Sequence, residues 1–243
     1  MLTRRCSEKL RKENLDVAFV HLDVTNIETI NAAKDVIEKS EGKLDVLVNN
    51  AGNSQLFYLT WEMDDRATGF RGAGIAEFGK NQNASTADVS AIRNCVEVNL
   101  IGLVQTTTTF LPLLRASEQA VILNVTTEMA SNSLQAGPNA FIHVVAYNTS
   151  KAAVNSYTIA LAQELKKEGI KVNAVTPGFT SSKLNNFLEG GKTTRRGAEA
   201  LLPWALIDKD GPTCEYCYDL PILVLTLVFV GQFLDDAGEI MPW

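Results

Sequence analysis

The feature that most constrains the fold is a regular alternation between short apolar runs and longer segments with helical periodicity. Four runs rich in Val, Ile and Leu have the length of strands and lie at residues 17–22, 45–49, 120–125 and 170–175. Short runs that are apolar throughout are typical of strands in a parallel sheet with helices on both faces. The alternation therefore predicts an α/β fold with a doubly wound, mainly parallel sheet.

Three of the intervening segments carry apolar residues at intervals of three and four. These segments predict helices at residues 27–40, 85–111 and 150–168. Pro112 is expected to end the second helix because proline has no amide hydrogen to donate, and Gly169 is expected to end the third.

Three other stretches do not fit the alternation. Residues 61–84 are Gly-rich and weakly periodic, so they predict a long surface loop. Residues 181–200 are polar with a Gly pair, which predicts part of a lid. Residues 214–230 differ abruptly in composition from both flanks and are interpreted as an atypical insert. The 243 residues are otherwise expected to form a single domain.

Composition excludes several classes of function. The chain carries a formal net charge of −6 and has no cluster of Lys and Arg with interleaved aromatics, which argues against nucleic acid as a partner. No apolar run approaches the roughly 20 residues of a membrane helix, and the N-terminus lacks the apolar core of a signal peptide. A soluble, cytoplasmic protein with a small-molecule ligand is expected.

The four cysteines suggest a reducing compartment rather than a disulfide framework. Only Cys214 and Cys217 are close in sequence, and a zinc site would need two more ligands, whereas His21 and His143 are distant. Two ordinary thiols are the preferred interpretation, so no metal site is predicted.

Small and polar residues follow each predicted strand. The segments are "HLDVT", "VNNAG", "NVTT" and "VTPGFT". In open α/β sheets, ligands bind just outside the carboxyl ends of the strands. The sequence therefore predicts a binding site at this edge of the sheet.

A tyrosine and a lysine stand four residues apart in "AYNTSK", at the opening of the third predicted helix. Side chains at positions i and i+4 of a helix lie on the same face, so Tyr147 and Lys151 would present a hydroxyl and an ammonium to a common point. This geometry suits proton transfer, but the same spacing occurs by chance at many helix starts. The pair alone leaves both interpretations open.

Five collinear segments resemble the short-chain dehydrogenase/reductase family. They are "LDV", "NNAG", "VNLIG", "YNTSK" and "PGFT", in this order. The resemblance covers about residues 1–213 and the C-terminal end. It implies a Rossmann-type domain that binds NAD or NADP and an enzyme that interconverts a carbonyl and an alcohol by hydride transfer.

The resemblance also implies catalytic roles. Tyr147 would be the general acid/base, assisted by Lys151, whose positive charge would lower the tyrosine pKa. Asn99 matches the asparagine that holds a water in the family's proton relay, and Thr127 stands where a substrate-orienting serine usually occurs. Ser131 and Ser133 are alternatives for the last role.

Cofactor contacts are implied along the same edge. Asp23 would contact adenine, and Lys151 would hold the nicotinamide ribose beside Tyr147. Arg4 lies where relatives that prefer NADP place a basic residue, so NADP(H) is favoured over NAD(H). A solvated basic helix start remains an alternative for Arg4. The other implied cofactor contacts are Val24, Asn50, Ala51, Gly52, Pro177, Gly178, Phe179 and Thr180.

One family element has no counterpart in the sequence. The TGxxxGxG loop that follows the first strand is absent, and the chain begins at the end of what would be the second strand. Two alternatives therefore stand beside the oxidoreductase: a non-catalytic Rossmann-like binding or regulatory protein, and an inactive truncated gene-model product. Relatives are usually homodimers or homotetramers, and the same is expected here.

Overall fold

Strands and helices alternate through the computed structural model, which describes residues 10–54, 83–138, 140, 143–213, 233–234 and 240–241. The α-helices are α2 (Ile27–Glu41), α3 (Val89–Val96), α4 (Gly102–Arg115), α5 (Asn132–Ala136), α6 (Val145–Leu165) and α7 (Thr194–Ala205). The strands are β1 (Val46–Asn49), β2 (Val121–Val125), β3 (Lys171–Val175), β4 (Phe233–Leu234) and β5 (Ile240–Met241).

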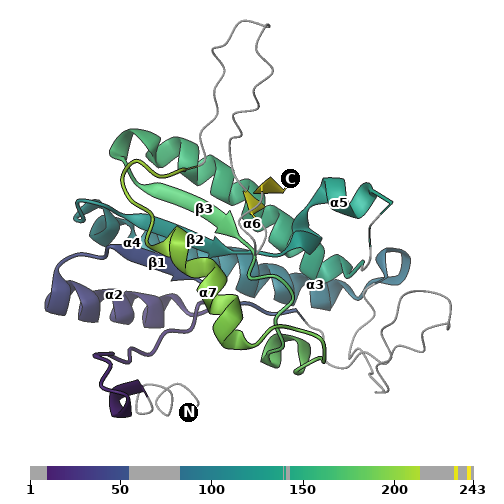
Figure 1. Cartoon of the computed structure of the whole chain (residues 1–243), viewed down its shortest axis with the longest axis horizontal. Helices are drawn as coiled ribbons and strands as arrows, with labels where there is room; N and C mark the ends of the chain where they lie inside the picture. Colours follow the sequence, from purple (N-terminus) through teal and green to yellow (C-terminus); the bar gives the residue numbers. More distant parts are fainter. Residues whose placement is uncertain are drawn as a thin grey trace, which may run out of the picture.

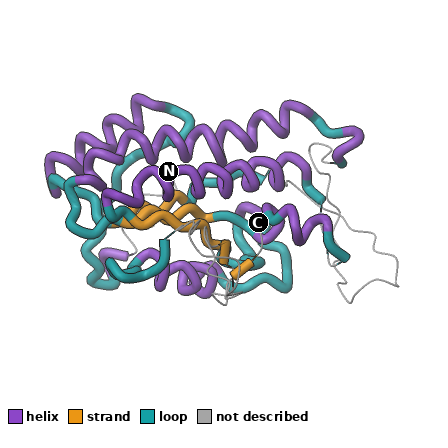
Figure 2. Tube along the Cα trace, turned by 90° about the horizontal axis from the view of Figure 1, so that it is seen from above, coloured by secondary structure: helices purple, strands orange, loops and turns teal. Residues whose placement is uncertain are grey.

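The strands form one sheet in the order β1-β2-β3-β4-β5. β1 to β4 run parallel, and β5 pairs antiparallel with β4. Helices α2, α4 and α6 cover one face of the sheet and α7 covers the other (Figures 1 and 2). This doubly wound arrangement confirms the predicted α/β fold of the Rossmann type.

The core lies on both faces of β2, whose five residues are all buried. Side chains alternate along a strand, so Ile122 packs toward Leu114 and Leu165 on the α4 and α6 side, whereas Leu123 packs toward Ala205 of α7. A strand buried on both faces has no solvent-facing positions, which explains why four of the five residues of β2 are apolar and why the fifth, Asn124, is hydrogen-bonded.

Three of the four predicted strands are confirmed as β1, β2 and β3, but the strand predicted at residues 17–22 is wrong. Val20 and Leu22 do pack against the cluster around Ile30 and Phe110. At the two ends of this segment, backbone groups bond to side chains and not to another strand. The Val17 carbonyl accepts from Arg11 Nε at 2.9 Å, and the Asp23 amide donates to Thr29 Oγ1 at 2.9 Å. An apolar run indicates burial, but a strand also needs a neighbouring strand to pair with. Within the described residues, β1 is the last strand of the sheet on this side.

The helix predictions hold with corrections to their bounds and continuity. The helix predicted at 150–168 begins earlier, as α6 at Val145, and the one predicted from residue 85 begins as α3 at Val89. The segment predicted at 85–111 is divided by a π-helical turn, Glu97–Ile101, between α3 and α4. Pro112 does not end α4, which continues to Arg115. The missing amide of one proline removes a single bond of the last turn, while Leu113 and Leu114 of that turn are buried in the core and hold it in place.

A buried polar network joins the sheet to the helices. Asn49 Nδ2 donates to Thr107 Oγ1 at 2.9 Å and to Asn124 Oδ1 at 2.8 Å. Asn124 Nδ2 donates to Thr158 Oγ1 at 2.9 Å. The network links β1, β2, α4 and α6, and it satisfies polar atoms that would otherwise be costly to bury.

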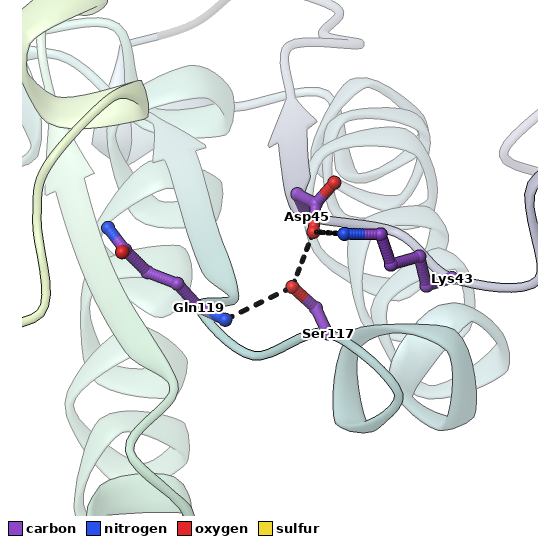
Figure 3. Close-up of polar contacts among 4 residues, drawn as sticks. All are labelled: Lys43, Asp45, Ser117 and Gln119. Atoms are coloured by element: carbon purple, nitrogen blue, oxygen red, sulfur yellow. Dashed lines mark hydrogen bonds and ion pairs between the residues drawn. The ribbon is translucent and has the colours of Figure 1, made fainter.

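A second polar cluster fixes the opposite end of the strands. Asp45 Oδ1 accepts from Lys43 Nζ at 2.8 Å and from Ser117 Oγ at 2.5 Å, and Ser117 Oγ accepts from the amide of Gln119 (Figure 3). These bonds hold the pKa of the Asp45 carboxyl below its usual value. The Asp45 carbonyl also accepts from Val121 N at 2.9 Å, so the cluster aligns the starts of β1 and β2.

A helix that crosses a membrane must be both long and apolar. Among the described residues, no helix combines the two properties required to cross a membrane.

Asn124→Ala is expected to lower the free energy of unfolding by about 2–4 kcal/mol, because it leaves Asn49 and Thr158 buried without their partner. Urea unfolding would measure the change. Asn132→Ala, at an exposed position in α5, is the matched control and should change stability by less than about 0.5 kcal/mol. Equal unfolding midpoints for the two variants would contradict the role of the network.

Gly102→Ala should also destabilise the protein. A Cβ there would lie 2.8 Å from Val24 Cγ2 and 2.9 Å from the Val24 carbonyl oxygen. Either α4 or the segment around Val24 must therefore shift. Overpacking of this kind costs about 1–3 kcal/mol, which exceeds the gain of roughly 1 kcal/mol from the better helix propensity of alanine. Thr108→Ala, on the exposed face of the same helix, is the control in thermal unfolding; a Gly102→Ala protein with unchanged Tm would refute the close approach.

Candidate active site

The predicted site residues gather at one edge of the sheet. Residues 50–54 follow β1, Thr126 and Thr127 follow β2, and residues 176–180 follow β3. Because these strands are parallel, all three segments lie at the carboxyl edge, where α6 also begins (Figure 1).

Tyr147 and Lys151 lie on one buried face of α6. Their exposed fractions are 7% and 4%. Lys151 Nζ donates to the carbonyl of Val125, the last residue of β2, at 2.7 Å. Lys151 therefore lies at the carboxyl end of β2, one helical turn along α6 from Tyr147.

The electrostatics of this pair differ from the expectation. Burial raises the pKa of the Tyr147 hydroxyl above its ordinary value, and burial lowers the pKa of the Lys151 ammonium to about 8. Desolvation of the hydroxyl is the main cause of the raised tyrosine pKa, so the prediction of a lowered tyrosine pKa is wrong for this arrangement. At neutral pH Tyr147 is a phenol and Lys151 is mostly an ammonium.

Asn99 is fully buried in the π-helical turn and contacts two other segments. Its Oδ1 accepts from the Asn53 amide at 2.6 Å, and its Nδ2 donates to the Asn53 carbonyl and to Ser150 Oγ, both at 2.8 Å. The carboxamide therefore fixes the loop after β1 against α6. Both of its N–H donors are used within the protein, and the water-holding role stays a prediction.

Two residues that sequence reasoning did not assign to the site take part in this arrangement. Ser150 Oγ donates to the Tyr147 carbonyl at 2.8 Å, which links Asn99 to the helix turn that carries the tyrosine. Cys95 Sγ lies 3.4 Å from the Asn53 carbonyl oxygen, and burial raises the thiol pKa to about 11. Ser150 lies inside the "YNTSK" motif, and Cys95 stands four residues before Asn99 on the helix, so spacing could have indicated both.

Thr127 lies at the predicted strand end and is half-buried. Its Oγ1 accepts from the Met129 amide at 3.3 Å as the cap of a short helical turn, Glu128–Ala130, which leaves its hydroxyl proton to be donated elsewhere. Ser131 is buried and caps α5 through a bond from the Leu134 amide, whereas Ser133 is exposed. Thr127 therefore has the better position of the three for contact with a ligand at this edge.

The segments assigned to the adenosine side lie at the same edge. Asp23 is exposed, and bonds from the amide and hydroxyl of Thr25 lower the pKa of its carboxyl. Val24 lies so close to Gly102 that a Cβ added to the glycine would be 2.8 Å from Val24 Cγ2. Asn50, Ala51 and Gly52 are exposed.

The segment after β3 is ordered by its own polar contacts. Gly178 has φ 69°, a left-handed conformation that favours glycine, and its amide donates to Thr176 Oγ1 at 3.1 Å. Thr180 Oγ1 donates to the Gly178 carbonyl, and Lys192 Nζ donates to the Pro177 carbonyl at 3.2 Å. The predicted turn is therefore present, with Phe179 exposed next to it.

Several predictions lie wholly or partly outside the described residues. These are Arg4, residues 61–82 of the predicted loop, and the insert at 214–230. The predicted lid at 181–200 is described, and its second half belongs to α7, which packs on the sheet.

The described residues fit part of a dinucleotide. A position for a Cβ on Gly52 lies 3.8 Å from Lys151 Nζ and 3.6 Å from Asn99 Oδ1, so exposed backbone after β1 approaches the buried lysine closely. A carboxylate, exposed backbone and an ammonium at one edge match the donors and acceptors of an adenosine and a ribose. No Gly-rich turn into a helix N-terminus is found at this edge within the described ranges.

Comparison with known proteins gives a consistent result. The family model described as "short chain dehydrogenase" matches residues 2–68 and 70–192. Salutaridine reductase of Papaver somniferum is 29% identical over 263 residues, covering 87% of this chain and 81% of the relative. The (+)-neomenthol dehydrogenase of Capsicum annuum is 25% identical, covering 87% of this chain and 82% of the relative.

Solved structures show the same architecture. The structure of salutaridine reductase from Papaver somniferum superposes with a TM-score of 0.67 at 26% identity, covering 87% of this chain and 85% of that one. The NADPH-bound carbonyl reductase from chicken fatty liver gives a TM-score of 0.69 at 21% identity, covering 98% and 82%, and supports the fold. The family match spans most of the chain and includes the edge that carries Tyr147, Lys151 and Asn99. The chain therefore belongs to the short chain dehydrogenase family, whose members are NAD(P)-dependent oxidoreductases.

Proposed function

We propose that this protein reduces a carbonyl to an alcohol, and oxidises the alcohol in reverse, with Tyr147 as the acid/base and Lys151 as its partner. The observation that carries the proposal is the burial of both side chains on one face of α6 at the carboxyl edge of the sheet. A bound nicotinamide would supply the hydride that reaches the carbonyl carbon.

Tyr147 would give its phenolic proton to the carbonyl oxygen as that oxygen gains negative charge. The raised tyrosine pKa keeps the hydroxyl protonated at neutral pH, which suits a proton donor for reduction. The Lys151 ammonium would stabilise the phenolate left behind, and a low-polarity site strengthens this attraction. Oxidation would reverse the proton transfer.

Other residues would orient these groups. Asn99 and Ser150 hold the first turns of α6 against the loop after β1, so they would keep Tyr147 in place. Thr127 would donate its hydroxyl proton to the substrate oxygen. Asp23, Val24 and residues 50–52 would hold the adenosine side of the cofactor, and residues 177–180 the nicotinamide side.

The preferred cofactor would be NADP(H), with Arg4 at the 2′-phosphate. A guanidinium binds phosphate through a fork of N–H donors, which supports this assignment. The physiological partner would be a small carbonyl or alcohol, and the protein would act as a cytoplasmic homodimer or homotetramer.

Tyr147→Phe should lower the kcat of NADPH-dependent carbonyl reduction by about 10²-fold or more, because general acid catalysis is lost. The Kd for NADPH, measured by Trp fluorescence, should change less than twofold. Tyr157→Phe, farther along α6 and packed in the core, is the matched control and should keep its activity.

Three results would count against the proposed function. Equal rates for wild type and Tyr147→Phe would exclude the tyrosine as the acid. NADPH binding by the wild type without turnover of any carbonyl would favour a binding or regulatory protein, and insoluble expression would favour the inactive truncated product.

Arg4→Ala should weaken NADPH binding about tenfold or more through loss of a charge-assisted hydrogen bond, and it should leave NADH binding unchanged. Fluorescence titration with both nucleotides measures the ratio of Kd values. Lys12→Ala is the control, since Lys12 is an exposed cation of the same N-terminal part. A parallel loss of affinity for NADH would show that Arg4 does not read the 2′-phosphate.

A further inference from the structure

The segment after β3 exposes more apolar surface than a solvated loop requires. Between residues 179 and 188, Phe179 is 44% exposed and Phe187 is 59% exposed, and Leu184 and Leu188 are also exposed. Apolar side chains that gather on one short segment mark a contact surface more often than scattered ones do.

A hydrogen bond ties this segment to the candidate active site. Ser54 Oγ donates to the Leu184 carbonyl at 2.7 Å. Ser54 directly follows Asn53, whose amide and carbonyl are both held by Asn99. The apolar segment therefore lies against the loop that contacts the Tyr147 helix through Asn99.

The conformation of the segment is specified by its own bonds. Ser182 and Asn185 form a reciprocal capping box around the short turn Lys183–Asn185, and the Phe187 amide donates to the Ser182 carbonyl at 2.7 Å. The Ser181 amide also donates to the Lys192 carbonyl at 2.9 Å, which closes the loop at its base.

The backbone at Phe187 is strained. Asn186 and Phe187 have φ values of 53° and 58°, and a left-handed conformation is costly for a bulky aromatic residue. Such strain persists where the surrounding structure enforces it, and it is concentrated at ligand-binding sites. An exposed ring on a strained but hydrogen-bonded turn is consistent with contact to a ligand rather than to the core.

Charge on the segment does not favour a charged substrate. Lys183 and Glu189 are both exposed and of opposite sign, and the Lys192 ammonium donates to the Pro177 carbonyl. The exposed charges therefore offset one another, while the apolar side chains remain.

We propose that residues 179–188 form an apolar wall of the substrate site, with Phe187 as its main contact, and that the substrate is a neutral carbonyl compound with a bulky apolar body. This inference rests on the proposed function. It adds the class of substrate and the residue that selects it.

Two phenyl ketones test the wall: acetophenone, which is small, and octanophenone, which carries a long apolar chain. Phe187→Ala should lower kcat/KM about tenfold for octanophenone, the size of effect expected for lost apolar contacts in a substrate pocket, and less than twofold for acetophenone. Phe187→Asn should do the same, because asparagine tolerates the left-handed backbone and lacks the ring. Leu206→Ala, which removes an exposed apolar side chain beyond α7, should alter neither value.

The outcomes separate the wall from the reaction. Equal losses for both ketones in the Phe187 variants would overturn the apolar wall while leaving the proposed function intact. A preference for 4-acetylbenzoate over acetophenone that disappears in Lys183→Ala would overturn the neutral substrate class.

Equilibrium dialysis of octanophenone with the full chain gives a readout that does not depend on turnover. Its Kd should rise about tenfold in Phe187→Ala if the wall is correct, even if no ketone is reduced. Absence of turnover would then refute the reaction alone, and an unchanged Kd would refute the wall alone.

Discussion

The hydrogen bonds of the Asn99 carboxamide hold together the parts on which the candidate active site depends. They join a π-helical turn, the loop after β1 and the helix that carries Tyr147 and Lys151. A carboxamide can do this because it has an acceptor and two donors in one plane, and its full burial makes each bond costly to break. If this side chain were apolar, the loop after β1 would lose the hydrogen bonds that connect it to α6 through Asn99.

Burial gives the proposed catalytic pair, Tyr147 and Lys151, its properties. Desolvation raises the pKa of the Tyr147 hydroxyl and lowers the pKa of the Lys151 ammonium to about 8. At neutral pH, Tyr147 is therefore a neutral donor and Lys151 is mostly a cation. A phenol beside an ammonium is an arrangement that can release a proton when negative charge develops nearby, because the charge of the lysine stabilises the phenolate. Burial also raises the pKa of the Cys95 thiol, so this side chain is neutral as well.

The rest of the fold keeps this edge in register. Asn49, Asn124 and Thr158 bind β1, β2 and α6 to one another on the helix side of the sheet, while Asp45 and Ser117 align the other end of the strands. Gly102 allows α4 to approach Val24 closely, which positions the neighbouring Asp23 at the same edge. In the proposed function, substrate selection would fall to residues 179–188, which Ser54 ties to this framework through the Leu184 carbonyl.

The sequence by itself determined the α/β class, three of the strands and the convergence of polar groups at one edge, because apolar periodicity and motif spacing report burial and local geometry. It also placed Tyr147 and Lys151 on one helix face. Only the tertiary structure decided that residues 17–22 form no strand, that α4 continues past Pro112, and that desolvation governs the tyrosine pKa. These outcomes depend on backbone partners, core contacts and solvent exclusion supplied by residues distant in sequence, which no local pattern records.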